Sequence, residues 1–247
     1  MAPVASLAFE SQFSFSDRVS QLLDRIDCRP AGSAEDREAI FRLRYEAYVR
    51  EGAIAPNFLG SFSDPYDEAD NAWLFGLYLD GELASSLRLH VATADYRDCP
   101  SHKVFADLLE PELDAGKVVI DPTRFVTNRR HSRLWPGLTY ATARLAWLAA
   151  DYFEADHLLA AVRAEHQAFY RRTFGHRLMC APRAYPLLEK PISLMTVHYP
   201  SVVHEVHQRY PFFRSTFFER RMLFDRELRL PQIPFESETV STIHHAA

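Results

Sequence analysis

The sequence predicts an α/β (α+β) fold in which a mixed central β-sheet is flanked by helices on both faces. A helical pattern over residues 33–52 precedes a hairpin pattern over residues 72–91, with Asp80-Gly81 as the turn. Short apolar strands and helical segments then alternate between residues 118 and 197. Because hairpin strands are antiparallel while strands separated by a helix are commonly parallel, we expect a sheet of mixed direction.

The expected elements follow from start and stop signals along the chain. Ser33 can cap a helix whose first turn is acidic, and Gly175 is typical of a helix end. Pro136 is tolerated close to a helix start. In order, we expect a short helix at 17–24, a strand at 25–30, a helix at 33–52, strands at 72–79 and 82–91, a short helix at 104–109, a strand from 118, a helix at 133–153, a strand at 156–162, a helix at 164–173, a strand at 192–197 and helical stretches at 198–227.

The chain of 247 residues is long enough for one large domain. We expect that domain over residues 25–230, between an N-terminal arm at 1–24 and a polar C-terminal tail at 231–247. A net charge of −5 argues against a nucleic-acid partner, which usually requires a basic surface.

The cysteines and the apolar segments bear on the compartment. The three cysteines are scattered, without CxxC spacing, which indicates free thiols in a reducing compartment: Cys28, Cys99 and Cys180. No apolar run is long enough to cross a bilayer, and no basic residue precedes the weak apolar stretch at the N-terminus. We therefore expect no integral membrane segment, no signal peptide and a cytoplasmic location.

The stretch from Val118 to Asn128 starts as a β-branched strand and then carries ionisable groups. Asp121 and Arg124 are three residues apart, so in a regular strand they would face opposite sides. They can converge only if the strand is bulged or bent, which Pro122 favours because it cannot donate to a ladder. A bulge would also free backbone N–H groups to bind a carbonyl oxygen. The alternative is a pair of surface salt bridges and a turn.

Four further charged residues precede this strand. Arg44 lies between two apolar lines of its helix, and Arg88 projects from a central-looking strand, where a charge requires a partner. Asp64 and Asp67 are three residues apart, so one helical turn would point both carboxylates the same way.

Three segments resemble the N-acyl-homoserine-lactone synthases and their relatives, the bacterial N-acyl amino acid synthases. They are FRLRYEAYVREG (41–52), DPYDEADNAWLFGLYLDGELASSLRLH (64–90) and VVIDPTRFV (118–126), within a resemblance that covers about residues 35–200. It implies an acyl-CoA N-acyltransferase (GNAT-like) fold and an enzyme that transfers an acyl chain from acyl carrier protein to an amine. An amino acid is the implied acceptor and acyl-phosphopantetheine the donor group, with no tightly bound cofactor.

The resemblance also implies roles for individual residues. The expected catalytic residues are Asp121, Arg124, Asp67 and Arg88; the substrate-binding residues are Arg44, Tyr48, Asp64, Phe105, Phe125, Val126 and Thr127; the carrier-binding residues are Asn128, Arg129, Arg130 and Arg133. Asp121, or else Asp67, would accept the amine proton or hold a water that does, and the backbone after Phe125 would bind the thioester oxygen. Because an ion-paired acid is a weak base, one carboxylate should be incompletely paired.

Two departures favour the N-acyl amino acid synthases, among them exosortase-associated acyltransferases, over the lactone synthases. Aspartate stands at position 121 where those enzymes have glutamate, and only Phe58 and Phe62 occupy the region of their tryptophan. Three competing functions are a coenzyme-A-dependent N-acetyltransferase, against which the missing Gly-rich loop counts, a lactone-type signal synthase, and a non-catalytic acyl-binding module. The basic run at 128–133 could equally be a solvated turn.

The remaining candidates have ordinary explanations. His204 and His207 are three apart but have no third ligand at metal spacing, so we expect surface residues and no metal site. Cys180 has no base beside it in sequence and is expected to be inert. The aromatic residues between 210 and 218 are either core or a lid over the acyl groove.

Overall fold

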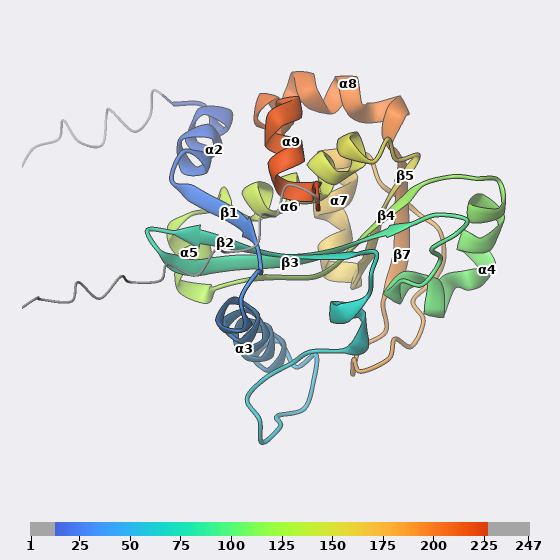
Figure 1. The fold of residues 1–247 in the computed structure, drawn as a ribbon, viewed down its shortest axis with the longest axis horizontal. Coiled ribbons are helices and arrows are strands. Elements are labelled where there is room, and N and C mark those ends of the chain that lie inside the picture. The colour runs from blue at the N-terminus through green and yellow to red at the C-terminus, as the bar shows by residue number, and fades with distance from the viewer. Residues whose placement is uncertain (1–12, 227–247) are drawn as a thin grey trace, which may run out of the picture.

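The computed structural model describes residues 13–226 of the chain. Within them a seven-stranded sheet has the order β1-β2-β3-β4-β5-β7-β6 (Figure 1). Only β4 and β5 are parallel neighbours, which confirms the mixed sheet. The strands are β1 (Ile26–Pro30), β2 (Ala72–Leu79), β3 (Glu82–Ala92), β4 (Val119–Thr127), β5 (His157–Val162), β6 (Arg177–Leu178) and β7 (Ser193–His198).

Helices cover both faces of the sheet, as expected (Figure 1). One face packs on α2 (Phe15–Leu23), α6 (Leu138–Tyr152), α7 (Gln167–Phe174), α8 (Tyr199–Arg209) and α9 (Phe217–Phe224). The other packs on α3 (Ala34–Arg50), α4 (Pro100–Asp114) and the short 3-10 turn η1 (Pro65–Glu68). Two further 3-10 turns, η2 (Ala164–His166) and η3 (Pro211–Phe213), and the helix α5 (Arg129–Leu134) complete the described elements.

The β2–β3 hairpin places an arginine beneath the sheet. Asp80 and Gly81 both have positive φ, 52° and 83°, which suits the tight turn that the sequence predicts. Along β3, Leu87 and Leu89 belong to the core on the α6 side. Because side chains alternate along a strand, Arg88 points to the α3 side, where it is fully buried.

The strand β4 contains a bulge, but not where we expected it. Pro122 pairs with Leu89 in continuous register, so the expected bend at Pro122 is wrong. The shift comes between the pairs Thr123–Arg88 and Val126–Ser86, so that Arg124 and the residue after it together oppose one residue of β3. Arg124 has φ +55°, and the extra residue turns its side chain to the α3 face.

The parallel pair β4–β5 opens along its length. Only two residue pairs join the strands, Val119 with His157 and Ile120 with Leu158. Beyond them β5 pairs only with β7, so the edge of β4 from Pro122 to Thr127 faces a gap rather than a strand. A cavity occupies this gap, as described below.

Several predicted boundaries are wrong for local reasons. The helix expected at 133–153 is two helices, α5 and α6, because Pro136 has no N–H to donate and disfavours helix at the residue before it. The helix expected at 104–109 is the much longer α4, which begins at Pro100 and is kinked at Phe105. The two-residue β6 is too short to give a sequence pattern.

The helix signals at Ser33 and Gly175 are confirmed, since Ser33 caps α3 and Gly175 ends α7 in the left-handed region. In the expected N-terminal arm, the described residues form α2, whose Val19 and Leu22 are buried. The expected polar tail at 231–247 lies outside the described residues. Within residues 13–226 no helix has the length and apolar character needed to cross a membrane.

Candidate active site

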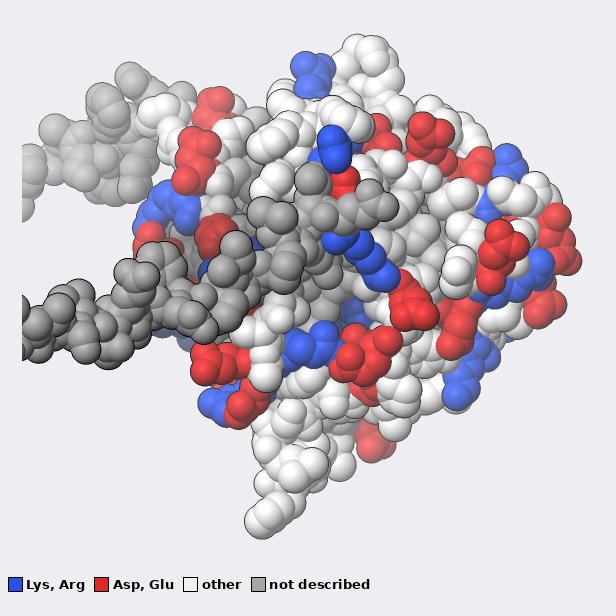
Figure 2. Space-filling model, viewed as in Figure 1, with Lys and Arg blue, Asp and Glu red and all other residues white. Residues whose placement is uncertain are grey.

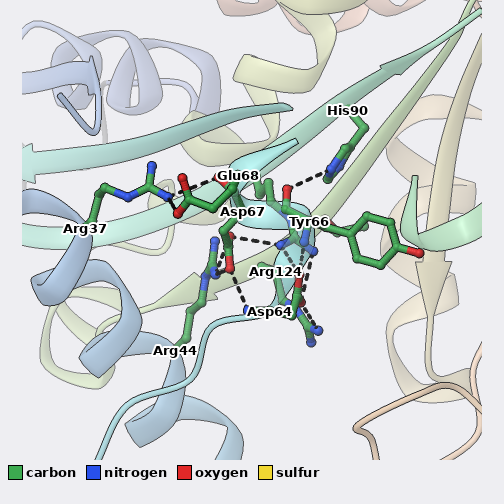
Figure 3. Close-up of polar contacts among 10 residues, drawn as sticks. Arg37, Arg44, Asp64, Tyr66, Asp67, Glu68, His90 and Arg124 are labelled. Atoms are coloured by element: carbon green, nitrogen blue, oxygen red, sulfur yellow. Dashed lines mark hydrogen bonds and ion pairs between the residues drawn. The ribbon is translucent and has the colours of Figure 1, made fainter. Parts of the chain in front are cut away.

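Five charged side chains from separate segments meet on the α3 face of the sheet (Figure 3). Arg44 comes from α3, Asp64 and Asp67 from the turn η1, Arg88 from β3, and Arg124 from the bulge of β4. All five are buried or nearly so. The sequence predicted each of them, and the structure brings them together.

The turn η1 holds both carboxylates in one orientation. Asp64 accepts a hydrogen bond from the backbone N–H of Tyr66 at 3.0 Å, and the Asp67 carboxylate accepts one from the Asp64 N–H at 2.9 Å. This reciprocal capping arises from the three-residue spacing and from Pro65 at the first helical position.

Asp64 bridges two arginines. Its Oδ1 accepts from Arg88 Nη1 at 2.6 Å, and its Oδ2 accepts from Arg124 Nε at 3.0 Å and Nη2 at 2.5 Å. Burial opposes ionisation of this carboxyl, but the hydrogen bonds and charges of Arg88 and Arg124 hold its pKa well below the usual value. Asp64 is therefore a carboxylate at neutral pH and a weak base.

Asp67 bridges the other pair. Arg44 Nη1 donates to its two oxygens at 2.7 and 2.9 Å, and Arg88 Nη1 lies 2.9 Å from Oδ1. Burial lowers the pKa of Arg44 to about 10, so this guanidinium remains charged at neutral pH. Three guanidinium groups and two carboxylates leave one positive charge in excess within the five-residue network.

Arg124 is held by aromatic rings as well as by Asp64. Its guanidinium carbon lies 4.6 Å from the ring centroid of Phe62 and 5.6 Å from that of Tyr48. A left-handed backbone at a residue other than glycine costs about 1–3 kcal/mol and persists only where surrounding contacts hold it. Such strain is common at functional sites, and at this position it places one guanidinium at the edge of the network.

Asp121 does not reach Arg124, and its expected role as a base in contact with substrate is not supported. The carboxylate is fully buried and accepts hydrogen bonds from the Ser101 N–H at 3.0 Å and the Ser101 hydroxyl at 2.7 Å. Since Cys99, the residue before α4, makes no side-chain cap, Asp121 takes the capping role from a neighbouring strand. Unlike Asp64 and Asp67, Asp121 has no arginine at ion-pair distance among the described residues, and burial raises its pKa. It lines none of the cavities described next.

Two cavities meet at Arg124. The first, of about 370 Å³, fills the gap between β4 and β5, and most of its walls are apolar. Four residues that the resemblance implies bind substrate line it: Tyr48, Phe125, Val126 and Thr127. The second cavity, of about 510 Å³, lies toward α4 and is lined by Asp64, Pro65, Tyr66, Glu68, Ala69, Asp98, Pro100, Lys103, Arg124, Tyr185, Pro186 and Leu187.

A basic groove of about 710 Å³ lies beside α5. The four residues expected to bind the carrier line it: Asn128, Arg129, Arg130 and Arg133. The other lining residues are a fourth arginine, Arg50, with Leu43 and Glu46 of α3 and Leu134 of α5. Arg130 lies 3.5 Å from Glu82, whereas Arg129 and Arg133 have no carboxylate at ion-pair distance within residues 13–226.

Phe105, which the resemblance implies binds substrate, lines neither of the two cavities that meet at Arg124. It is fully buried in a second core between α4 and the sheet, with Leu109, Val119 and Leu194.

Sequence reasoning missed four residues of the site. Pro100 at a helix start could have indicated that Ser101 and Lys103 lie in the first turn of α4. Tyr66 and Tyr185 gave no signal, because they lie outside any periodic element. Burial and the nearby Asp121 raise the pKa of Tyr185 well above its usual value, so its phenol is neutral at the cavity wall.

The residues with ordinary explanations can also be placed. His204 contacts Gln208, and His207 accepts a hydrogen bond from the Trp147 indole. Within residues 13–226 no group of three or more metal-ligating side chains is clustered. In the aromatic segment, Phe212 and Phe213 belong to the main core.

A family model described as N-acyl amino acid synthase FeeM matches residues 39–198. No curated protein sequence matches the chain.

Three solved structures are similar in fold. FeeM, an N-acyl amino acid synthase from uncultured soil microbes, aligns with a TM-score of 0.63 and 18% identity, over 76% of this chain and 98% of FeeM. BjaI, a coenzyme-A-dependent acyl-homoserine lactone synthase, gives 0.54 and 16%, over 76% and 89% of the two chains. The acyl-homoserine lactone synthase LasI gives 0.52 and 13%, over 69% and 88%. The expected N-acyltransferase (GNAT-like) fold is thus confirmed.

Proposed function

Because the chain belongs to the FeeM family of N-acyl amino acid synthases, and is therefore an acyltransferase, we propose that it transfers a long-chain acyl group from acyl carrier protein to the amine of an amino acid. One observation supports this most strongly: Arg124 borders both cavities, so one guanidinium faces an acyl donor on one side and an acceptor on the other. The cavity between β4 and β5, with Phe125, Val126 and Phe169 in its wall, suits an acyl chain, and the cavity toward α4, where Lys103 and Arg124 lie, suits an amino acid.

The reaction is aminolysis of a thioester. The neutral amine attacks the thioester carbon, the C–N bond forms, and the carbonyl oxygen becomes an oxyanion. Collapse of this intermediate breaks the C–S bond, and the thiolate leaves and takes up a proton. The excess positive charge of the network and the unpaired edge of β4 at the bulge are placed to stabilise the oxyanion.

The carboxylates serve to position other groups. Asp64 and Asp67 are each paired with two arginines and fix the orientation of those arginines, and the lowered pKa of Asp64 makes it a weak base. Asp121 fixes the first turn of α4, which carries Lys103 to the acceptor cavity. Once the C–N bond has formed, the nitrogen carries an extra proton, and this proton passes through solvent to the departing thiolate rather than to a buried side chain.

Asp121→Asn tests this division of roles. Burial raises the pKa of Asp121, so a wild-type enzyme that used it as the base would lose kcat/KM as the pH fell through that raised pKa. We expect instead that the variant lowers kcat/KM by the same factor at every pH, because only the position of α4 changes. Steady-state rates between about pH 5 and 9 check this; loss of an acidic limb in the variant alone would make Asp121 the base.

The basic groove supports acyl carrier protein as the donor. Acidic carriers are attracted to arginine clusters. The Asn128 side chain already accepts from the N–H groups of Arg130 and His131, so a phosphate or a carrier would be bound by the charged side chains of the groove. Free thiols among the described residues suit a reducing cytoplasm, where carrier-linked acyl chains are made.

Replacement of Arg129, Arg130 and Arg133 by alanine is expected to raise KM for acyl carrier protein more than about tenfold. KM for a small acyl thioester that lacks the carrier should stay unchanged, which serves as the control within one variant. If KM rises equally for both donors, or not at all, the groove does not bind the carrier.

Lys103 is the described cation of the acceptor cavity that has no carboxylate partner within residues 13–226. We expect Lys103→Ala to raise KM for the amino acid about fivefold, since one exposed ion pair contributes about 1 kcal/mol or less. The amino acid amide lacks the carboxylate, so its KM should be equal in wild type and variant. An equal rise for acid and amide would remove Lys103 as the carboxylate partner.

The proposed function as a whole is tested with purified protein, a mixture of amino acids and either acyl carrier protein or acyl-coenzyme A as donor. Mass spectrometry is expected to detect N-acyl amino acids at a higher rate with the carrier. Product from acyl-coenzyme A alone would make the coenzyme the donor, and tight acyl binding without product from either donor would support a binding module.

A further inference from the structure

A long uncharged loop projects from the α3 side of the molecule. The twelve residues from Gly52 to Ser63 contain no Asp, Glu, Lys or Arg. In Figure 1 the loop that follows α3 extends below the body, and Figure 2 shows it as a white protrusion without blue or red atoms. At its tip Phe58 is 104% and Leu59 83% exposed, the two most exposed large apolar side chains among the described residues.

Hydrogen bonds hold the tip in this exposed conformation. Asn57 Oδ1 accepts from the Gly60 N–H at 2.9 Å, and Asn57 Nδ2 donates to the Ser61 carbonyl at 2.9 Å. The Tyr45 hydroxyl of α3 donates to the Asn57 carbonyl at 3.1 Å. Gly60 has φ +60°, which closes the turn without the strain of a side chain. The turn is thus built to present two apolar side chains to their surroundings.

The base of the same loop forms part of the site. Ala53 lines the donor cavity, and Phe62 contacts the Arg124 guanidinium. The Phe62 N–H donates to the carbonyl of Phe41 in α3 at 3.1 Å, which ties this end of the loop to the helix. The tip therefore has a rigid connection to the mouth of the cavity proposed to hold an acyl chain.

We propose that the Phe58–Leu59 tip inserts into the surface of a lipid bilayer. Apolar side chains at a fixed turn gain free energy when they enter the acyl region, and they require no complementary charge. An acidic protein partner would instead require cations, which the tip lacks and which the groove beside α5 supplies. A bilayer at this position would give a lipid-like product a short path out of the site. The membrane contact itself does not depend on which acyl donor or acceptor the protein uses.

Vesicle binding tests the proposal with the full chain and without turnover. The wild type should co-sediment with phosphatidylcholine vesicles that contain no anionic lipid, and about 0.5 M salt should leave the binding unchanged, because the contact carries no charge. The double variant Phe58→Ser/Leu59→Ser should bind at least about tenfold more weakly. Its transfer rate with a water-soluble donor should equal that of the wild type, which shows that it is folded.

A matched control removes two exposed aromatic residues elsewhere. Phe217 and Phe218 of α9 are 66% and 71% exposed and lie on the other face of the sheet (Figure 1). Phe217→Ser/Phe218→Ser should bind vesicles as the wild type does. As a second readout, Phe58→Trp should show a blue-shifted emission increment when vesicles are added.

Several outcomes would overturn the proposal. The proposal is wrong if the wild type does not bind neutral vesicles, or if the tip variant binds them as well as the wild type does. It is also wrong if the α9 variant rather than the tip variant loses binding, or if binding requires anionic lipid and disappears in salt. A tip variant that loses dimerisation or carrier affinity, while its vesicle binding is unchanged, would show that the tip contacts protein. Failure of acyl transfer in the wild type would leave the vesicle result standing, so the two proposals fail separately.

Discussion

Arg124→Ala is expected to lower kcat/KM for acyl transfer by at least about 100-fold, because among the described residues it removes the one cation that borders both cavities. The fold should persist, since Asp64 keeps Arg88 as a partner at 2.6 Å. Steady-state rates from acyl carrier protein, with circular dichroism of the same samples, check both parts of the prediction.

Arg124→Gly separates the guanidinium from the bulge. Glycine adopts the observed φ of +55° freely, so this variant keeps the bulge and relieves its strain. We expect it to be more stable than Arg124→Ala and equally inactive. Arg183→Ala, which removes an exposed ion pair with Asp107, should keep wild-type activity. An active Arg124→Gly would show that backbone geometry alone carries the reaction.

Asp67→Ala is expected to lower the free energy of unfolding by about 3–5 kcal/mol, because it leaves a buried charge without its partner. Arg44 is fully buried, and its only hydrogen bonds to described residues go to Asp67; its Nε and Nη2 atoms have no such partner. The loss is measured by urea unfolding followed by circular dichroism.

The neighbouring acid provides the matched control. Glu68 follows Asp67 in η1, but it is largely exposed and pairs with Arg37 at the surface. Glu68→Ala should cost about 1 kcal/mol or less, because water screens exposed ion pairs. Equal losses for the two variants would mean that the Asp67 network is solvated rather than buried.

The fold was predictable where a local signal decides the structure. The Asp80-Gly81 turn predicted the hairpin, and the spacing of Asp64 and Asp67 indicated that one helical turn would point both carboxylates the same way. Arg88 could be recognised as a buried cation because strand alternation places it opposite the apolar residues of β3. The five residues of the charge network could therefore each be named from the sequence.

The rest depends on tertiary structure. The bulge lies at Arg124 rather than Pro122 because the register with β3, and not the local preference of proline, decides where the extra residue goes. The Asp121 carboxylate is buried because α4 starts at Pro100 and brings Ser101 to it. Sequence periodicity contains neither fact, so the residues that converge could be predicted, but their division into reacting and positioning groups could not.

The most direct test of the central claim is the fate of the acyl chain. Purified protein is incubated with long-chain acyl carrier protein and amino acids, and the partition between N-acyl amino acid and free fatty acid is measured by mass spectrometry. We predict that wild-type protein delivers the chain to the amine with little hydrolysis, and that Arg124→Ala forms neither product above the uncatalysed rate. Free fatty acid as the main product, or full N-acyl formation by Arg124→Ala, would contradict aminolysis at this site.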